Sequence, residues 1–107
     1  MAAPGDMSAA TFLAKADALK ARGPLALLSG DIGKLKAEGM AAGQAYRERL
    51  QADKAAGRPP HSCPPRGGSV NSNQILTHLR TYTPAERART TMKTAIADYF
   101  AKTYPCR

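Results

Sequence analysis

The sequence is poor in large aromatic residues. Its 107 residues include no Trp, only two Phe and four Tyr, and much of the 43% hydrophobic fraction is alanine. A chain of this length forms one domain around a single core, and alanine buries little apolar area per residue. We therefore expect a single helical domain, residues 1–107, whose stability is marginal unless something besides the core supports it.

Long apolar runs are also missing. No segment approaches the roughly 18–20 apolar residues that cross a bilayer, so we predict no membrane span. The first residues, MAAPGD, have none of the charged, apolar and cleavage regions of a signal peptide. We expect any export signal to lie outside this numbering, and residues 1–7 to form an N-terminal extension of the domain.

Acidic residues are few. Eight Asp and Glu stand against sixteen Lys and Arg, which gives a formal net charge of +8. This balance favours anionic partners such as nucleic acid, an acidic protein, a lipid surface or a cell-wall polymer. The cations are dispersed along the chain, however, and dispersed charge is also what a solvated basic exterior has. Composition leaves both interpretations open.

Strand patterns are absent as well. No alternating run of β-branched or aromatic residues reaches four positions. Amphipathic helical patterns cover residues 8–21, 31–56, 71–82 and 84–102, and Pro24 opens a short turn after the first of them. The fold class that follows is all-α, a small four- to five-helix bundle.

Two of these helices begin with strong capping signals. Asn71 followed by Gln74 forms a capping box, and Thr83-Pro84-Ala85-Glu86 supplies a cap, a proline at the first helical position and an acid at the third. We predict that the last helix runs without a break from Pro84 to about Lys102. Its predicted buried positions are Ala88, Met92, Ile96 and Tyr99, with Phe100 beside them.

The second helix has small residues in its apolar stripe. Its stripe is formed by Ile32, Leu35, Gly39, Gly43, Tyr46 and Leu50. A glycine inside a helix costs about 1 kcal/mol relative to alanine. We therefore expect Gly39 and Gly43 to allow close packing of another backbone, from the same chain or from a second copy in a homodimer. A weak helix that tolerates its glycines is the alternative.

Only two cysteines are present. Cys63 lies in PPHSCPPRGG and Cys106 in KTYPCR, so a disulfide between them would span 43 positions. In the chain-entropy model such a bridge stabilises a protein by roughly 4 kcal/mol. We favour this disulfide, which would fasten the long loop to the end of the last helix. It indicates an oxidising compartment, such as a bacterial periplasm, or secretion.

Three other uses of the cysteines compete with the disulfide. A zinc ion would need His61, Cys63, His78 and Cys106, but HSC lacks the spacing of a two-ligand zinc hook. A nucleophilic cysteine would need a partnering histidine and an oxyanion hole, and only His61 is near in sequence. Two unrelated buried thiols are the third alternative. We expect no metal and no cofactor.

The segment between the helical halves, residues 57–69, is rich in proline and glycine. Loops of this length in a compact domain are often functional or tied down. A loop fastened by the disulfide could present Arg58, His61 and Arg66 to a partner as exposed polar contacts. Plain solvation of the three side chains is the alternative.

The residues in and after this loop resemble a known family. Cys63 and Pro65 match its Cys-x-Pro, Gln74 matches its helix entry, and Tyr104-Pro105-Cys106 matches its end. The remaining matches are Ile75, Leu79 and Pro84, with Gly39, Gly43 and Ala45 in EGMAAGQAY upstream. In this ordered combination, from Gly39 to the end, the chain resembles the Rap/Tai family of type VI secretion amidase immunity proteins.

The resemblance carries its own expectations. It implies a small helical bundle, often dimeric, in which the two matched cysteines form a disulfide. It also implies a periplasmic protein without enzymatic activity that binds and inhibits a peptidoglycan amidase effector. The fold, the bridge and the compartment are already predicted from the residues, so the resemblance adds the immunity function and a protein partner that is a cell-wall hydrolase.

Other functions remain as alternatives. A nucleic-acid or anionic-polymer binder would use Arg80, Arg87, Arg89 and Lys93, although the chain has no recognised binding signature and few aromatics for stacking. A small periplasmic stress chaperone is a further alternative, whose cysteines would be spaced differently.

An enzyme is not expected. The sequence has neither a Ser-His-Asp spacing nor a glycine-rich phosphate loop. The carboxylates Asp31, Glu38, Glu48 and Asp53 lie at polar helix positions. Intrahelical pairs such as Lys34–Glu38 and Arg49–Asp53 account for them without a catalytic role.

Overall fold

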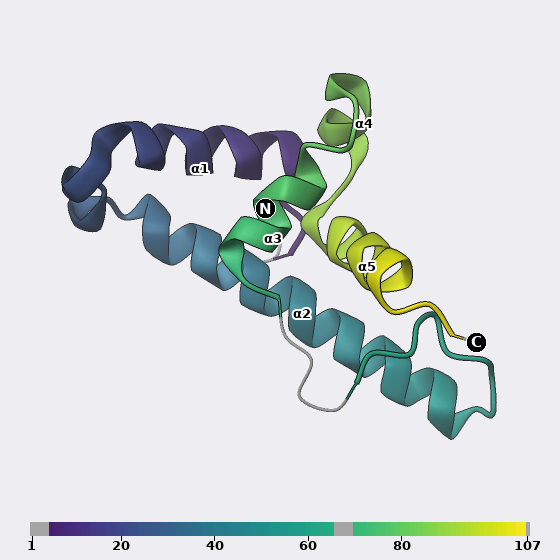
Figure 1. The fold of residues 1–107 in the computed structure, drawn as a ribbon. Coiled ribbons are helices and arrows are strands. Elements are labelled where there is room, and N and C mark those ends of the chain that lie inside the picture. The colour runs from purple at the N-terminus through teal and green to yellow at the C-terminus, as the bar shows by residue number, and fades with distance from the viewer. Residues whose placement is uncertain (1–4, 66–69, 107) are drawn as a thin grey trace.

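The computed structural model describes residues 5–65 and 70–106, and in these ranges it contains five α-helices and no strand (Figure 1). The predicted all-α fold is confirmed. The elements are α1 (Ala9–Arg22), the 3-10 helix η1 (Gly23–Leu28), α2 (Asp31–Ala55), α3 (Ser72–Leu79), α4 (Pro84–Arg89) and α5 (Met92–Thr103).

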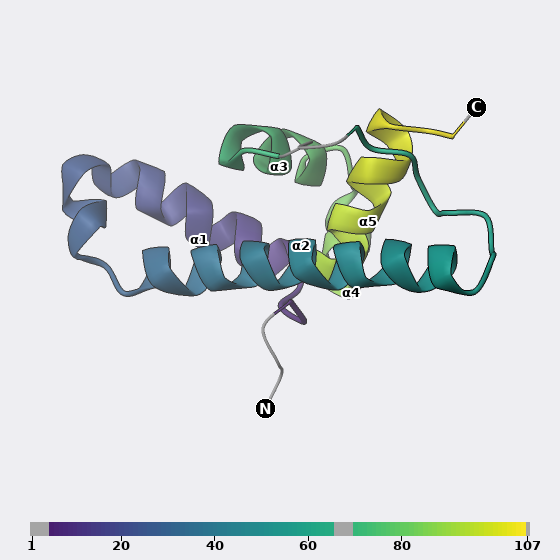
Figure 2. The ribbon, with the colours of Figure 1, turned by 90° about the horizontal axis from the view of Figure 1, so that it is seen from below.

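The first half of the chain is a helical hairpin. Ser8 caps α1 by accepting a hydrogen bond from the Thr11 backbone N–H, and Gly23 ends it with a φ of +59° that favours glycine. The chain then turns through η1 and returns along α1 as the long helix α2 (Figure 2). This hairpin makes the molecule elongated, with extents of 47 × 28 × 26 Å.

The second half packs across this hairpin. Both predicted capping boxes are present, Asn71 with Gln74 at α3 and Thr83 with Glu86 at α4. The core lies where α5 crosses α2 and α1, and α3 covers it from the other side (Figures 1 and 2). Its largest buried side chains are Phe12, Leu13, Leu35, Tyr46, Leu76, Leu79, Met92 and Ile96.

The prediction of one unbroken last helix is wrong. α4 ends at Arg89, Thr90 is extended, and Thr91 caps a separate helix, α5, by accepting from the Thr94 N–H. Ala88, predicted to be buried, is exposed, whereas Met92 and Ile96 are buried as predicted. The helix breaks because the backbone at the junction hydrogen-bonds to another part of the chain.

That other part is the N-terminal segment. The Ala9 N–H donates to the Thr90 carbonyl (2.7 Å), and the Met92 and Lys93 N–H groups donate to the carbonyls of Met7 (2.8 Å) and Gly5 (3.0 Å). These bonds use backbone groups that a continuous helix would need for itself. Residues 5–7 are therefore fastened to the domain, and residues 1–4 of the predicted extension lie outside the described residues.

Gly5 also connects this segment to α2. Its N–H donates to a carboxylate oxygen of Glu38, which is buried in α2. The expected intrahelical pair of Glu38 with Lys34 is therefore not what accounts for this carboxylate. A buried acceptor is satisfied by a backbone donor from 33 residues away.

Candidate functional site

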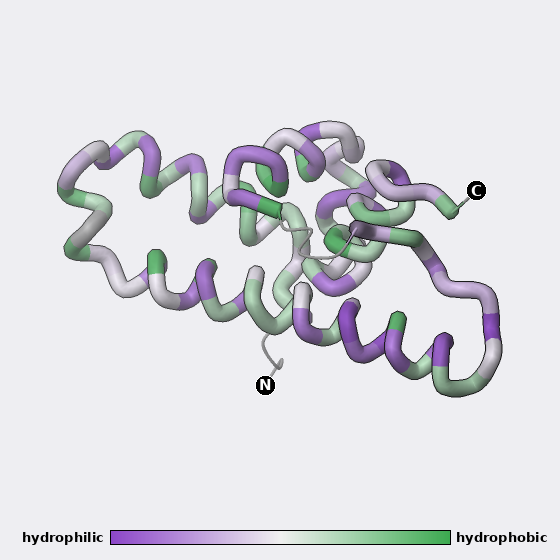
Figure 3. Tube along the Cα trace, turned by 60° about the horizontal axis from the view of Figure 1, so that its bottom comes forward, coloured by the Kyte–Doolittle hydropathy of each residue, from purple (hydrophilic) through white to green (hydrophobic). Residues whose placement is uncertain are grey.

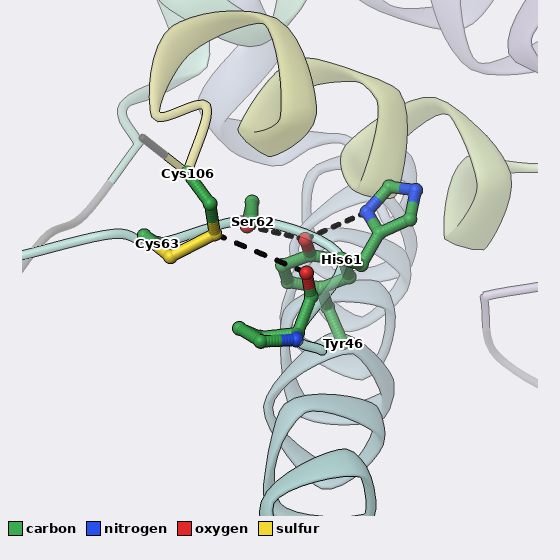
Figure 4. Close-up of a disulfide and its surroundings, with 6 residues drawn as sticks. Tyr46, His61, Ser62, Cys63 and Cys106 are labelled. Carbon is green, nitrogen blue, oxygen red and sulfur yellow. Dashed lines mark hydrogen bonds between the residues drawn. A yellow bond between two sulfur atoms is a disulfide. The ribbon is translucent and has the colours of Figure 1, made fainter. Parts of the chain in front are cut away.

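The disulfide predicted from the sequence is present. Cys63 and Cys106 are bonded, with their Cα atoms 5.0 Å apart, and the bridge joins the loop after α2 to the chain end after α5 (Figure 4). Both sulfur atoms are part of the disulfide, so neither cysteine can act as a thiolate nucleophile or zinc ligand while the bridge is intact. All three alternatives raised by the sequence, a zinc site, a nucleophilic cysteine and two unrelated thiols, are excluded for this form of the protein.

Tyr46 of α2 fastens the same loop from beneath. Its hydroxyl hydrogen-bonds to His61 Nδ1 (2.9 Å) and to Ser62 Oγ (Figure 4). Its ring stacks on Phe100 of α5, with ring centroids 5.0 Å apart. The Cys63 N–H donates to the Tyr104 carbonyl (2.8 Å). Three kinds of bond, covalent, side-chain and backbone, thus hold residues 61–63 in place.

The predicted contact residues of the loop have different roles. Arg58 is 62% exposed in its side chain and forms an ion pair with Asp53 (3.2 Å), so Asp53 pairs with the loop and not with Arg49. His61 is half-buried and hydrogen-bonds to Tyr46, so it helps to position the loop. Arg66 lies outside the described residues. Arg58, Pro59 and Pro60 form the exposed tip of the described part of the loop, residues 57–65.

Ser62 does not provide an exposed hydroxyl nucleophile. It is 2% exposed and its Oγ is hydrogen-bonded to Tyr46. A serine nucleophile needs access to its substrate and a base that takes its proton. The Tyr46–His61–Ser62 cluster has the geometry of a structural anchor.

The prediction for Gly39 and Gly43 is wrong in its intrachain form. A Cβ built on either residue meets nothing within 4 Å, so no backbone of the described chain packs closely there. Packing of these glycines against a second copy in a homodimer stays a prediction. The two glycines instead lie on the floor of an open groove.

This groove has a volume of about 1050 Å³ and lies between α1, α2, α3 and the chain around Pro64, Pro65 and Val70. Its lining is mainly apolar, and residues that define it include Leu19, Ile32, Gly39, Gly43, Leu50 and Ile75. Met40 stands at its edge and is 67% exposed. We call this feature the α2 groove.

Sequence reasoning identified the stripe of the α2 groove but not the groove. The available signal was length: α2 has 25 residues and extends about 37 Å, whereas the helix that crosses it, α5, has 12 and extends about 18 Å. Because the apolar stripe of α2 continues beyond the ends of α5, α5 cannot cover the stripe along its whole length.

A second, partly buried cluster of polar side chains ties α3 to α5. The Tyr82 hydroxyl donates to Asp98 Oδ2 (2.6 Å), and His78 Nε2 lies 3.0 Å from the same hydroxyl. Burial lowers the pKa of His78, and burial together with Asp98 raises the pKa of Tyr82. Each polar group has a partner in the cluster, so we interpret it as structural.

Most of the cations considered for nucleic-acid binding form ion pairs or hydrogen bonds within the protein. Arg80 pairs with Asp17 (2.7 Å), Lys93 pairs with Asp6 (3.1 Å), and Arg87 Nε donates to the Leu79 carbonyl (3.1 Å). Figure 3 shows hydrophilic segments recurring along the second half of α2 as well. Arg47, Arg49 and Lys54 lie in that half of α2, so the cations are not confined to the last two helices.

No helix within residues 5–65 and 70–106 is long and apolar enough to cross a membrane. Comparison of the chain with protein-family models, with curated proteins and with solved structures gives no match.

Proposed function

We propose that this chain is an exported binding protein, without catalytic activity, that inhibits a peptidoglycan amidase effector of a type VI secretion system in the periplasm. The observation that carries the proposal is the fastened loop: the disulfide, the Tyr46 hydroxyl and the Tyr104 carbonyl all hold residues 61–63. The resemblance of residues 39–107 to the Rap/Tai family supplies the class of partner.

A fastened loop suits an inhibitor for an energetic reason. Ordering a flexible segment on binding costs free energy, and a loop held beforehand avoids much of that cost. The anchors leave Arg58, Pro59 and Pro60 exposed, so a protruding tip is available to enter a cleft. The net charge of +8 adds attraction to an acidic partner surface.

The test measures inhibition directly. The oxidised chain is titrated against a type VI peptidoglycan amidase from the same source, and release of peptide from purified sacculi is followed. We expect inhibition that saturates at one chain per amidase active site. The double variant Arg58→Ala/Pro59→Ser should weaken inhibition at least tenfold, because both changes lie at the exposed tip and leave the anchors intact.

Arg22→Ala is the matched control. Arg22 is exposed at the C-terminal end of α1, and Figure 1 shows that this end of the hairpin is opposite to the loop. Arg22→Ala removes the same charge as Arg58→Ala and should leave inhibition unchanged. Equal loss in both variants would mean that total charge governs binding. No inhibition at micromolar concentrations of the unmodified chain would refute the proposal.

A further inference from the structure

The α2 groove is an apolar surface that the described fold leaves open. Ile32, Gly39, Gly43 and Leu50 follow one side of α2 and line the groove, but only the inner residues of the helix, such as Leu35 and Ala42, are buried. Exposed apolar surface that is gathered in a groove marks a place where another apolar surface binds. The exposed loop tip, Arg58 to Pro60, does not line it.

The size and floor of the groove fit a helix. Two turns of helix with side chains, about 11 Å long and 10–12 Å across, occupy roughly 1000 Å³, which is close to the groove volume of about 1050 Å³. Because a Cβ at Gly39 or Gly43 would meet nothing within 4 Å, an incoming helix can approach the α2 backbone closely at both positions.

The charges at the groove select the kind of helix. Its charged lining residues are Lys36 and Arg47, both exposed, and no ion pair involving either is present among the described residues. Among the described residues that line the groove there is no Asp or Glu. A two-fold dimer through this surface would present each copy's cations to a surface of the same charge, which opposes self-association.

From these observations we infer that the α2 groove binds an amphipathic helix of a partner protein, with an apolar face flanked by acidic residues. Its apolar face, repeating at three- and four-residue intervals, lies on Gly39 and Gly43. Its carboxylates lie beside Lys36 and Arg47. This inference goes beyond the proposed function, since it concerns a different surface and does not depend on amidase binding.

The experiment uses two designed helical peptides with the same Leu and Ile face, one flanked by Glu and the other by Lys. Each is labelled, and its binding to the full oxidised chain is measured by fluorescence anisotropy at low and at physiological salt. The Glu-flanked peptide should bind at least tenfold more tightly than the Lys-flanked one, and raised salt should narrow the difference.

Two substitutions locate the binding surface. Gly43→Leu fills the groove floor and should weaken binding of the Glu-flanked peptide at least tenfold. Gly33→Leu makes the same change on the same helix, where a Cβ also meets nothing within 4 Å but the residue does not line the groove. It should leave binding unchanged. Circular dichroism of both variants should show the helical content of the unmodified chain.

Three results would overturn the inference. The first is equal affinity for the two peptides, and the second is equal affinity of the Gly43→Leu and Gly33→Leu variants. The third is a dimer in sedimentation that Gly43→Leu alone dissociates and the peptide does not displace, because a second copy would then be the occupant. The Arg58→Ala/Pro59→Ser variant should bind the peptide normally, so failure here is distinguishable from failure of the proposed function.

Discussion

Gly5 lies against Lys93 and the buried carboxylate of Glu38. Its φ of +97° is in the region that residues with a side chain rarely adopt, and a Cβ there would lie 2.8 Å from Lys93 Cε. Only glycine places the N–H on Glu38 and the carbonyl on the Lys93 N–H without strain. A single residue thus joins the N-terminal segment to α2 and α5.

Substitution of Gly5 tests this contact. Gly5→Ala should lower the free energy of unfolding by about 1–2 kcal/mol, because the side chain strains the backbone and displaces Lys93. Urea denaturation followed by circular dichroism measures the change. Gly33→Ala, at an open helical position, is the control and should stabilise by about 0.5–1 kcal/mol. Equal stability of Gly5→Ala and the unmodified chain would show that residues 5–7 are not docked in solution.

At the scale of the elements, some helix boundaries are set by local capping and others by a distant part of the chain. The capping boxes at α3 and α4 are local and formed as predicted from the sequence. The break at Thr90 is not local, because it depends on hydrogen bonds to residues 5–9. α3 and α5 are joined by the cluster of His78, Tyr82 and Asp98.

His78 makes this junction sensitive to pH. Burial lowers the pKa of His78 more than a hydrogen bond to the Ala95 backbone raises it. The pKa of His78 in the folded chain is therefore below its ordinary value of 6.5. The unfolded chain therefore takes up the proton first, and the unfolding free energy should fall as the pH is lowered through 6.5. Above that pH the histidine is neutral in both states and its contribution does not change.

The measurement is urea denaturation at intervals between pH 7.5 and 5.5. His78→Gln has no titrating group at this position, so its unfolding free energy should depend less on pH over the same range. His61→Gln is the control, since His61 lies in the separate loop cluster. Parallel pH profiles for His78→Gln and the unmodified chain would contradict the assignment.

At the scale of the whole molecule, few long-range fasteners hold an elongated, alanine-rich structure. The disulfide is the strongest of them, since it links positions separated by 43 residues and joins the loop after α2 to the C-terminal end of the described chain. Tyr46, whose ring packs on Phe100 and whose hydroxyl binds the loop, supports the same end.

Removal of the disulfide should therefore destabilise the folded chain. Cys63→Ser/Cys106→Ser should lower the free energy of unfolding by roughly 4 kcal/mol, mainly because the unfolded chain regains its freedom. Thermal and urea denaturation measure the loss, and the reduced form of the unmodified chain should match the double variant. A loss below about 1 kcal/mol would mean that the Tyr46 anchor alone is enough to fix the loop.

The sequence by itself determined the helical class, the two capping boxes and the pairing of the cysteines. Each depends on short-range patterns, or on there being only two cysteines to pair. The tertiary structure alone decided three other features: the break between α4 and α5, the contact of Glu38 with Gly5, and the opening of the α2 groove over Gly39 and Gly43. These depend on which distant segments meet, and periodicity within one helix contains no information about the length or position of the helix that packs on it.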